Sequence, residues 1–222
     1  MKKTVFLETE RLLLRAWQDE DIAPFAEMCA DPQVMRYFPE PLTREKSEYL
    51  VSRCREKQEK DRFCIAPVEV KANGEFLGFV GLNRPSYDAP LPFDPCVEIG
   101  WRLKRSAWGQ GYASEAAREW LRFGFETIGL DEIVAFTIPE NIPSQKVMQR
   151  IGMTRDVDGD FLHPNLPADH PIAPHVLYRL KKEDWSAEQQ RPAGGRCALP
   201  RVFLPDSRET TGPSPDRPEA QD

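Results

Sequence analysis

The chain has 222 residues, a net charge of −6 and a pI near 5.3, and 40% of its residues are hydrophobic. This size suits one domain of ordinary dimensions plus an appendage, and the apolar content excludes wholesale disorder. The acidic balance argues against nucleic acid as the main partner, and no apolar run approaches membrane-spanning length.

The 5 cysteines are scattered along the chain without a Cys-x-x-Cys pair. This pattern is typical of reduced thiols and argues against a zinc site or a disulfide framework. The first residues also lack a signal-peptide cleavage region. We therefore expect a cytoplasmic protein without a resident metal.

The N-terminal third predicts one strand and two helices. Residues 6–17 are an apolar run interrupted by charges, and we expect them to form a single strand. Acidic residues then open a helix over 19–30, which must end before Pro32. Thr43 is the expected N-cap of a second helix that reaches about residue 60.

The middle of the chain predicts a hairpin and a long loop. Residues 62–71 and 75–84 are rich in β-forming side chains, and Asn73-Gly74 between them is a strong hairpin signal. Residues 85–95 contain too many prolines for a helix or a central strand, and a loop of this length suggests a substrate-side position.

A strand at 96–103, a glycine-rich turn at 108–113 and an amphipathic helix at 113–128 follow one another. This order directs free backbone N–H groups and the positive end of the helix dipole at one spot, which is suited to bind phosphate. A Walker-type loop would end in Gly-Lys-Ser/Thr, which is absent. A dinucleotide fingerprint would need a third glycine where Ser114 stands.

The remaining elements are a strand, a short helix and two closing strands, at residues 131–138, 143–151, 155–162 and 175–180. The last two strands flank an insertion rich in proline and histidine. From Ser186 the composition changes to Pro, Gly, Ser and charge, which predicts a disordered tail over 186–222.

Two motifs together resemble the GNAT N-acetyltransferases. The turn Trp-Gly-Gln-Gly-Tyr-Ala is similar to the family's pyrophosphate loop, (Arg/Gln)-x-x-Gly-x-(Gly/Ala), except that Trp108 fills the first place. The family's second motif, an Asn, a Ser/Ala three residues later and a distal Gly-(Phe/Met), matches Asn141, Ser144, Gly152 and Met153. The resemblance extends over roughly residues 5–183 and is closest to the RimJ/RimL type.

The resemblance implies an α/β (mixed α+β) GNAT fold over residues 1–185, followed by the tail. Its central sheet would be mixed and mostly antiparallel, with about seven strands, a V-shaped splay and about four flanking helices. Acetyl-CoA would bind in the splay between 96–103 and 131–138. The implied cofactor-binding residues are Trp101, Arg102, Leu103, Trp108, Gly109, Gln110, Gly111, Tyr112, Ala113, Ser114, Asn141 and Ser144.

The resemblance also implies direct attack of a primary amine on the thioester. Glu98 is the candidate base, because family members often carry a glutamate on this strand; a structural carboxylate is the alternative. Many relatives place a proton-donating tyrosine where Met148 stands, so Ser144 is the candidate donor to the thiolate. A first-turn helix serine is the alternative for Ser144.

The acceptor is expected to be a protein N-terminal amine. A small-molecule amine such as an antibiotic or toxin is the rival, and Asp88, Asp94 and Asp169 hint at a cationic one. A CoA-binding module without catalysis is the alternative from another class. His163 and its neighbouring histidines lack metal-ligand spacing. The oligomeric state has no signal in the sequence.

Overall fold

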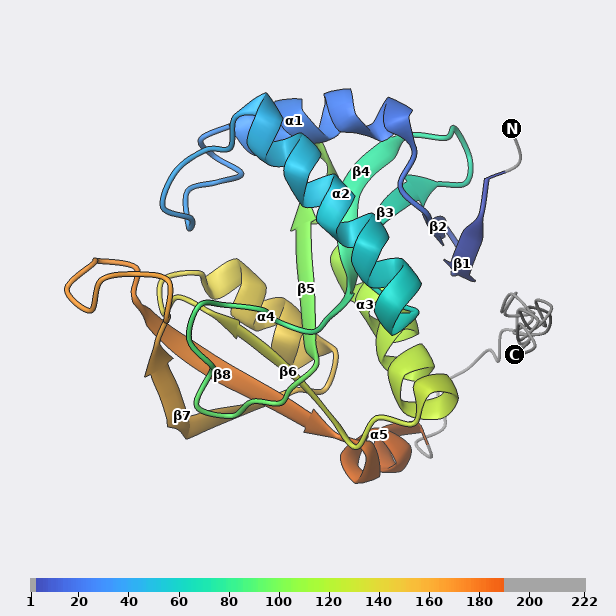
Figure 1. Cartoon of the computed structure of the whole chain (residues 1–222). Coiled ribbons are helices and arrows are strands. Elements are labelled where there is room, and N and C mark those ends of the chain that lie inside the picture. The colour runs from blue at the N-terminus through green and yellow to red at the C-terminus, as the bar shows by residue number, and fades with distance from the viewer. Residues whose placement is uncertain (1–2, 190–222) are drawn as a thin grey trace, which may run out of the picture.

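The structure, a computed structural model, describes residues 3–189. In this part of the chain eight strands form one sheet in the order β1-β2-β3-β4-β5-β6-β8-β7 (Figure 1). The strands are β1 (Val5–Glu8), β2 (Leu12–Arg15), β3 (Ile65–Val70), β4 (Phe76–Asn83), β5 (Glu98–Leu103), β6 (Glu132–Thr137), β7 (Thr154–Leu162) and β8 (Pro174–Lys181). The α-helices are α1 (Ile22–Ala30), α2 (Arg44–Asp61), α3 (Tyr112–Arg122), α4 (Ile142–Arg150) and α5 (Lys182–Gln189).

Neighbouring strands are antiparallel except at the centre of the sheet. β5 and β6 are parallel, and they pair at a single position, where Glu98 lies opposite Val134 and the Val134 N–H donates to the Val97 carbonyl at 2.9 Å. Beyond Glu98 the two strands diverge, as Figure 1 shows. The expected mixed, mostly antiparallel sheet with a splay at this place is confirmed.

Residues 6–17 do not form the single strand that the sequence predicted. They form the hairpin of β1 and β2, with Leu7 opposite Leu14. Thr9 turns the chain, because its N–H donates to the Leu12 carbonyl and its Oγ1 accepts from the Leu12 N–H, both at 3.0 Å. The prediction was wrong because the polar residues of this turn look like exposed positions of a longer strand. This hairpin accounts for the eighth strand.

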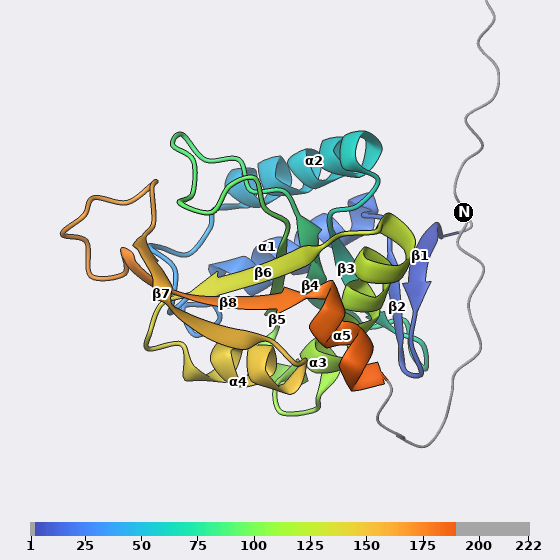
Figure 2. The same cartoon turned by 90° about the horizontal axis from the view of Figure 1, so that it is seen from below.

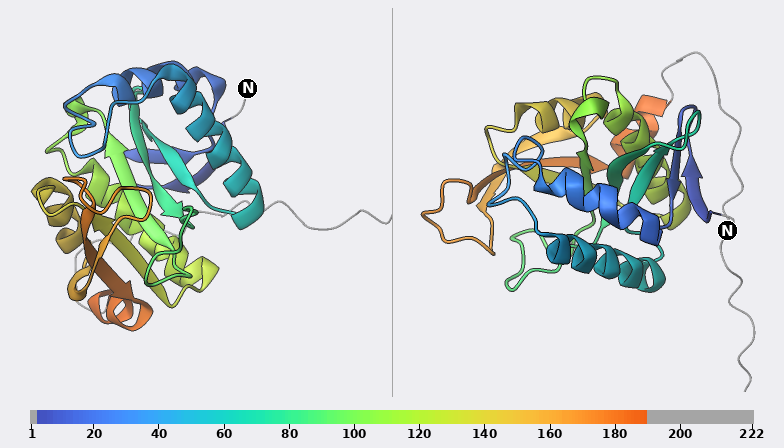
Figure 3. Two further views of the ribbon diagram at one scale, coloured as in Figure 1. Left: turned by 60° about the vertical axis from the view of Figure 1, so that its left-hand side comes forward. Right: turned by 90° about the horizontal axis from the view of Figure 1, so that it is seen from above.

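Helices cover both faces of the sheet (Figures 2 and 3). α1 and α2 pack side by side on one face, where Phe25, Cys29 and Val51 meet Phe79 of β4. The expected Thr43 cap of α2 is confirmed, since its side chain accepts from the Lys46 N–H at 3.2 Å.

α3 and α4 cover the other face of the sheet. Small residues of α3, Ala116 and Ala117, are fully buried and let the helix approach the strands closely. The predicted helix over 113–128 changes at Arg122 into a π-helical segment, Phe123–Ile128. Gly124 in this segment lies so near β6 that a Cβ would come within 2.8 Å of Ile133.

α5 was not predicted. It follows β8 and continues past residue 185, the proposed domain boundary. Trp185 anchors its start, because the indole is buried and lies 5.8 Å from the Phe125 ring. The rest of the predicted tail, residues 190–222, lies outside the described residues. No helix within residues 3–189 is both long and apolar enough to span a membrane.

Candidate active site

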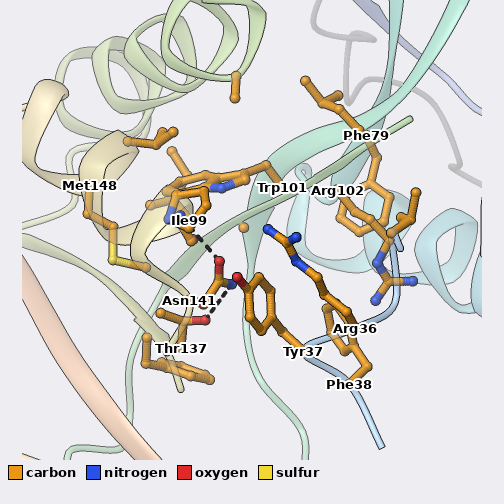
Figure 4. A pocket seen from close by; sticks show the side chains of 18 of the residues that line it. Arg36, Tyr37, Phe38, Phe79, Ile99, Trp101, Arg102, Thr137, Asn141 and Met148 are labelled. Atoms are coloured by element: carbon orange, nitrogen blue, oxygen red, sulfur yellow. Dashed lines mark hydrogen bonds between the residues drawn. The ribbon is translucent and has the colours of Figure 1, made fainter. Parts of the chain in front are cut away.

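A cavity of about 1070 Å³ opens where β5 and β6 diverge. Its walls come from the loop between α1 and α2, from β4 and β5, from the turn before α3, from the first turns of α4 and from the loop before β8. Figure 4 shows Tyr37 and Arg36 reaching in from the α1–α2 loop, opposite Trp101 of β5 and Asn141 at the start of α4. Glu98 and the predicted cofactor-binding residues line this one cavity, with Gln110 excepted.

β5 presents different groups on its two faces. Ile99 and Leu103 are buried in the layer under α3, whereas Glu98 and Arg102 occupy the opposite face. The backbone alternates in the same way, so the N–H and C=O of Trp101 point to the same side as the Val97 carbonyl, toward the gap. An extended ligand in the gap could pair with these groups as an additional strand would.

The turn before α3 leaves several N–H groups available. Gly111 is the N-cap of α3 at φ 81°, and its carbonyl accepts the first helical bond from Glu115 N at 3.0 Å. The N–H groups of Tyr112, Ala113 and Ser114 precede that bond and therefore have no partner within the helix. Gly109 also has a left-handed φ of 74°, and a Cβ there would meet no atom within 4 Å. The turn therefore has the donors and the space that an anion requires.

Trp108 explains how the turn tolerates an exception to the family motif. Its indole Nε1 donates to the Leu103 carbonyl at 2.8 Å and so fastens the turn to the end of β5. Gln110 points elsewhere, because its Nε2 donates to the Ser106 carbonyl at 2.6 Å. Its side chain therefore supports the turn and does not face the cavity.

Arg11 of the β1–β2 turn contacts the turn before α3 on its outer side. This contact was not predicted from the sequence. Its Nη2 donates to the Gln110 carbonyl at 3.1 Å, and its guanidinium pairs with Glu115 at 2.6 Å. The guanidinium also lies over the Tyr112 ring, 4.4 Å from the centroid. No local pattern could have identified this residue, because its partners lie about a hundred positions further along the chain.

Glu98 lines the cavity, and the pKa of its carboxyl group is raised above the ordinary value. Burial raises its pKa to about 7, although a hydrogen bond from Asn83 and the charge of Lys57 oppose the rise. Lys57 Nζ donates to Asn83 Oδ1 at 2.6 Å, which leaves the Asn83 amide NH₂ directed at the carboxylate. Asn83 and Lys57 were not predicted, because α2 and β4 bring them to Glu98 only in the folded chain.

Known acetyltransferases resemble this chain in sequence and structure. The model of the acetyltransferase (GNAT) domain family matches residues 11–154. The uncharacterized N-acetyltransferase YnaD of Bacillus subtilis is 31% identical over 181 residues, covering 81% of this chain and 99% of that protein. The chain belongs to the GNAT acetyltransferase family. It is an N-acetyltransferase.

Two further relatives support this membership. The FsC-acetyl coenzyme A-N(2)-transacetylase of Aspergillus fumigatus is 36% identical over 143 residues, which is 60% of each chain. The crystal structure of a GNAT-family acetyltransferase from Bacillus anthracis superposes with a TM-score of 0.66 at 30% identity, covering 80% of this chain and 99% of that one. The expected GNAT fold is thereby confirmed.

The second GNAT motif forms the start of α4. Asn141 caps the helix, since its Oδ1 accepts from the Ser144 N–H at 3.3 Å, and its Nδ2 donates to Thr137 Oγ1 at 2.9 Å. Both side-chain groups of Asn141 thus have protein partners, which supports a positioning role. Ser144 is partly buried and lines the cavity, as does Met148 at the place of the family's tyrosine.

An aromatic cluster closes the far side of the cavity. His163 lies 4.6 Å from the Tyr87 ring and 5.0 Å from the His175 ring. Burial lowers the pKa of His163 to about 4, with His175 adding to the effect, and burial also lowers the pKa of His175. Both rings are therefore neutral near pH 7. Residues 3–189 contain no group of three His, Cys, Asp or Glu that could hold a metal ion.

The charged residues that line the cavity are not the acidic ones from which the sequence suggested a cationic acceptor. Neither Asp88, Asp94 nor Asp169 lines it, and Glu98 is the one carboxylate on its walls within the described residues. The lining cations are Arg36, Arg102, Lys146 and Arg150. The walls therefore favour anionic ligands, and the suggestion of an acidic mouth for a cationic drug is not supported.

Proposed function

We propose that this GNAT enzyme transfers the acetyl group of acetyl-CoA to a primary amine inside this cavity. One observation carries the proposal: a turn with free N–H groups, an unpaired strand edge and a carboxylate with a pKa of about 7 meet in the same cavity. The turn at Gly109 to Ser114 would hold the pyrophosphate, and Trp101 would pair with the pantetheine arm. Lys146 and Arg150, one turn apart on α4, add positive charge for the phosphates.

In the proposed reaction, Glu98 acts as the base, directly or through a water. It removes a proton from the acceptor ammonium, and the neutral amine attacks the thioester carbonyl. A C–N bond forms and the C–S bond breaks. The thiolate leaves with the electron pair and takes a proton from the Ser144 hydroxyl, while the acetylated nitrogen, which is positively charged after the attack, releases its second proton to solvent; solvent then returns a proton to Ser144.

The acceptor is proposed to be a primary amine, and a protein N-terminal amine follows from the RimJ/RimL-like sequence of the two motifs. A small-molecule amine is the second candidate, and it is favoured by the aromatic and cationic walls described above. A CoA-binding module without catalysis would bind the cofactor in the same gap, yet Glu98 would have no acceptor to deprotonate.

Calorimetric titration with acetyl-CoA tests the cofactor site. Gly109→Ala adds a methyl group to a cavity-lining glycine at φ 74°. We expect binding to weaken about tenfold or more, since the added Cβ occupies the space of the anion and strains the turn. Gly74→Ala is the matched control, because Gly74 has φ 72° and equally open surroundings but lies in the β3–β4 turn, away from the cavity.

Equal binding by both variants would contradict the proposed pyrophosphate site, since their backbone strain is the same. Acetyl transfer is then measured by thiol release with a panel of amines. Binding of acetyl-CoA without thiol release from any amine would favour the non-catalytic module.

A further inference from the structure

Arg102 is a cation without a counterion. Among residues 3–189 no carboxylate lies within ion-pair distance of its guanidinium, and its Nε is a buried donor without a hydrogen-bond partner. Its Nη1 contacts only the Cys29 sulfur, at 3.2 Å. Thiols are weak acceptors, and burial raises the pKa of the Cys29 thiol, so this sulfur is not an anion near neutral pH.

Aromatic rings hold this guanidinium in place. Its Cζ lies 4.1 Å from the centroid of the Phe38 ring and 5.4 Å from that of Phe79, as Figure 4 illustrates. Stacking on rings stabilises the cation and restricts its plane, and the edge formed by Nε and Nη2, which have no hydrogen-bond partner within residues 3–189, could donate to an oxyanion in a bidentate manner. Arg102 is partly buried and its buried Nε has no acceptor, which costs stability, so a ligand that accepts from this donor would bind favourably.

Arg102 also lies on the same face of β5 as the proposed base. Gly100 separates it from Glu98, and a Cβ at Gly100 would approach only the Glu98 Oε1, at 3.7 Å. The surface of β5 between the Glu98 and Arg102 side chains is therefore not covered by other residues. At about 3.3 Å per residue, the Cα atoms of Glu98 and Arg102 are roughly 13 Å apart. The cofactor contact that the resemblance implies for Arg102 would come from its backbone, because its guanidinium lies on the α1–α2 side of β5.

We propose that the acceptor carries an anionic group, most simply a carboxylate, which Arg102 binds while its amine lies at Glu98. Of the two proposed acceptor classes, this favours the small-molecule amine, in the form of an amino acid-like molecule, over a protein N-terminus. Arg36, which also lacks an ion pair in the described chain and stacks on Tyr37 and Trp108, lies at the same end of the cavity and adds to the positive field. This inference rests on the proposed acetyl transfer to an amine.

The test uses matched acceptors with the full-length wild-type enzyme. Linear ω-amino acids from glycine to aminocaproate, and phenylalanine, are each compared with the amine of the same skeleton that lacks the carboxylate, and with the corresponding amide. We expect kcat/KM to be about tenfold or more higher for a carboxylated member, because a charge-assisted pair is lost in the others. Equal or better turnover of amides and short peptides would overturn the proposal and favour a protein N-terminus.

Two variants separate the anion site from the rest of the cavity. Arg102→Met should raise KM for the carboxylated acceptor about tenfold, leave the bare amine unchanged and leave the Kd of acetyl-CoA unchanged. Gly100→Ala adds a methyl group to the surface of β5 between Glu98 and Arg102, where it approaches only the Glu98 Oε1. We expect this variant to have a higher KM for the acceptor and an unchanged melting temperature. Arg53→Met, at an exposed position of α2, is the control.

The outcomes distinguish the two proposals. If acetyl-CoA binds but no amine of any kind releases thiol, the proposed function fails. If amines are acetylated with no preference for an anionic group, or if Arg102→Met weakens acetyl-CoA binding instead, the proposed acceptor class fails and the transferase assignment stands.

Discussion

Glu98 illustrates how one residue can acquire its chemistry from its surroundings. A glutamate on a strand has an ordinary pKa in water, and here burial raises the pKa to about 7. A base with a pKa near the working pH combines a useful ionised fraction with enough proton affinity. Asn83 and Lys57 keep the rise moderate, since both favour the ionised form.

The ionisation of Glu98 predicts the pH dependence of catalysis. The base must be deprotonated, so kcat/KM should rise with pH through an apparent pKa of about 7 and level off above it. Glu98→Gln should lower kcat/KM about a hundredfold or more and remove this limb. The measurement is a pH–rate profile of thiol release; a profile that is unchanged in Glu98→Gln would exclude Glu98 as the base.

Lys57 should tune that profile without touching the acceptor. In Lys57→Met the Asn83 amide loses its hydrogen-bond partner and Glu98 loses a nearby positive charge, so the pKa of Glu98 should rise. The rise of kcat/KM with pH should therefore occur at higher pH than in the wild type. Lys60→Met, at an exposed position of the same helix, is the control. A limb that shifts equally in both variants would argue for a general charge effect.

At the scale of elements, the β1–β2 turn and the start of α3 act together. Thr9 Oγ1 donates to Glu115 at 2.5 Å, and Arg11 pairs with Glu115 and with the Gln110 carbonyl. The hairpin at one edge of the sheet therefore holds the turn that is proposed to bind the pyrophosphate. A hydrogen-bonded loop loses less conformational entropy when a ligand orders it.

Removing this restraint should weaken cofactor binding. Arg11→Met keeps the aliphatic stem over Tyr112 but loses the bonds to Gln110 and Glu115, and we expect the Kd of acetyl-CoA to increase several-fold, about fivefold, because each ordering contact contributes about 1 kcal/mol. Calorimetry measures the change, with Arg44→Met on α2 as the control. An unchanged Kd would show that the turn is rigid without Arg11.

At the scale of the whole molecule, a buried ion cluster joins the sheet to the helical layer. Arg15 of β2 binds Asp21, ahead of α1, at 2.6 and 2.7 Å, and binds Glu69 of β3 at 2.6 Å. All three residues are at most 4% exposed. Burial would raise the pKa of Glu69, but hydrogen bonds from Lys3 and Arg15 and their charges bring it below its ordinary value.

Breaking this cluster should destabilise the fold. Arg15→Met leaves two buried carboxylates without their common cation, and we expect a loss of about 3–5 kcal/mol in the free energy of unfolding at pH 7. The pKa of Glu69 is lower in the folded state than in the unfolded state. Its contribution to the stability of the wild type is therefore fully present above the unfolded-state pKa and is lost as the pH falls through the folded-state pKa. Denaturant titrations at two pH values measure both effects; a loss below 1 kcal/mol would contradict the role of Arg15.

Local pattern and short spacing were enough to predict several elements of the fold and two motifs of the site. The helical periodicity of α1 to α4, the Asn73-Gly74 hairpin, the Thr43 cap and the two GNAT motifs were all predicted from neighbouring residues. So was the glycine turn before α3, because the spacing of small residues directly sets the backbone. The single strand over 6–17 was wrong, since a polar turn and an exposed strand share the same local composition.

Contacts between distant residues could be identified only in the folded chain. The clamp by Arg11, the support of Glu98 by Lys57 and Asn83, and the position of Arg102 away from the α3 face all join residues far apart in the chain. The pKa of Glu98 likewise depends on burial that several elements create together. Burial and long-range contacts are properties of the packed chain, so a linear pattern identifies the reactive residues while their partners and ionisation follow only from the fold.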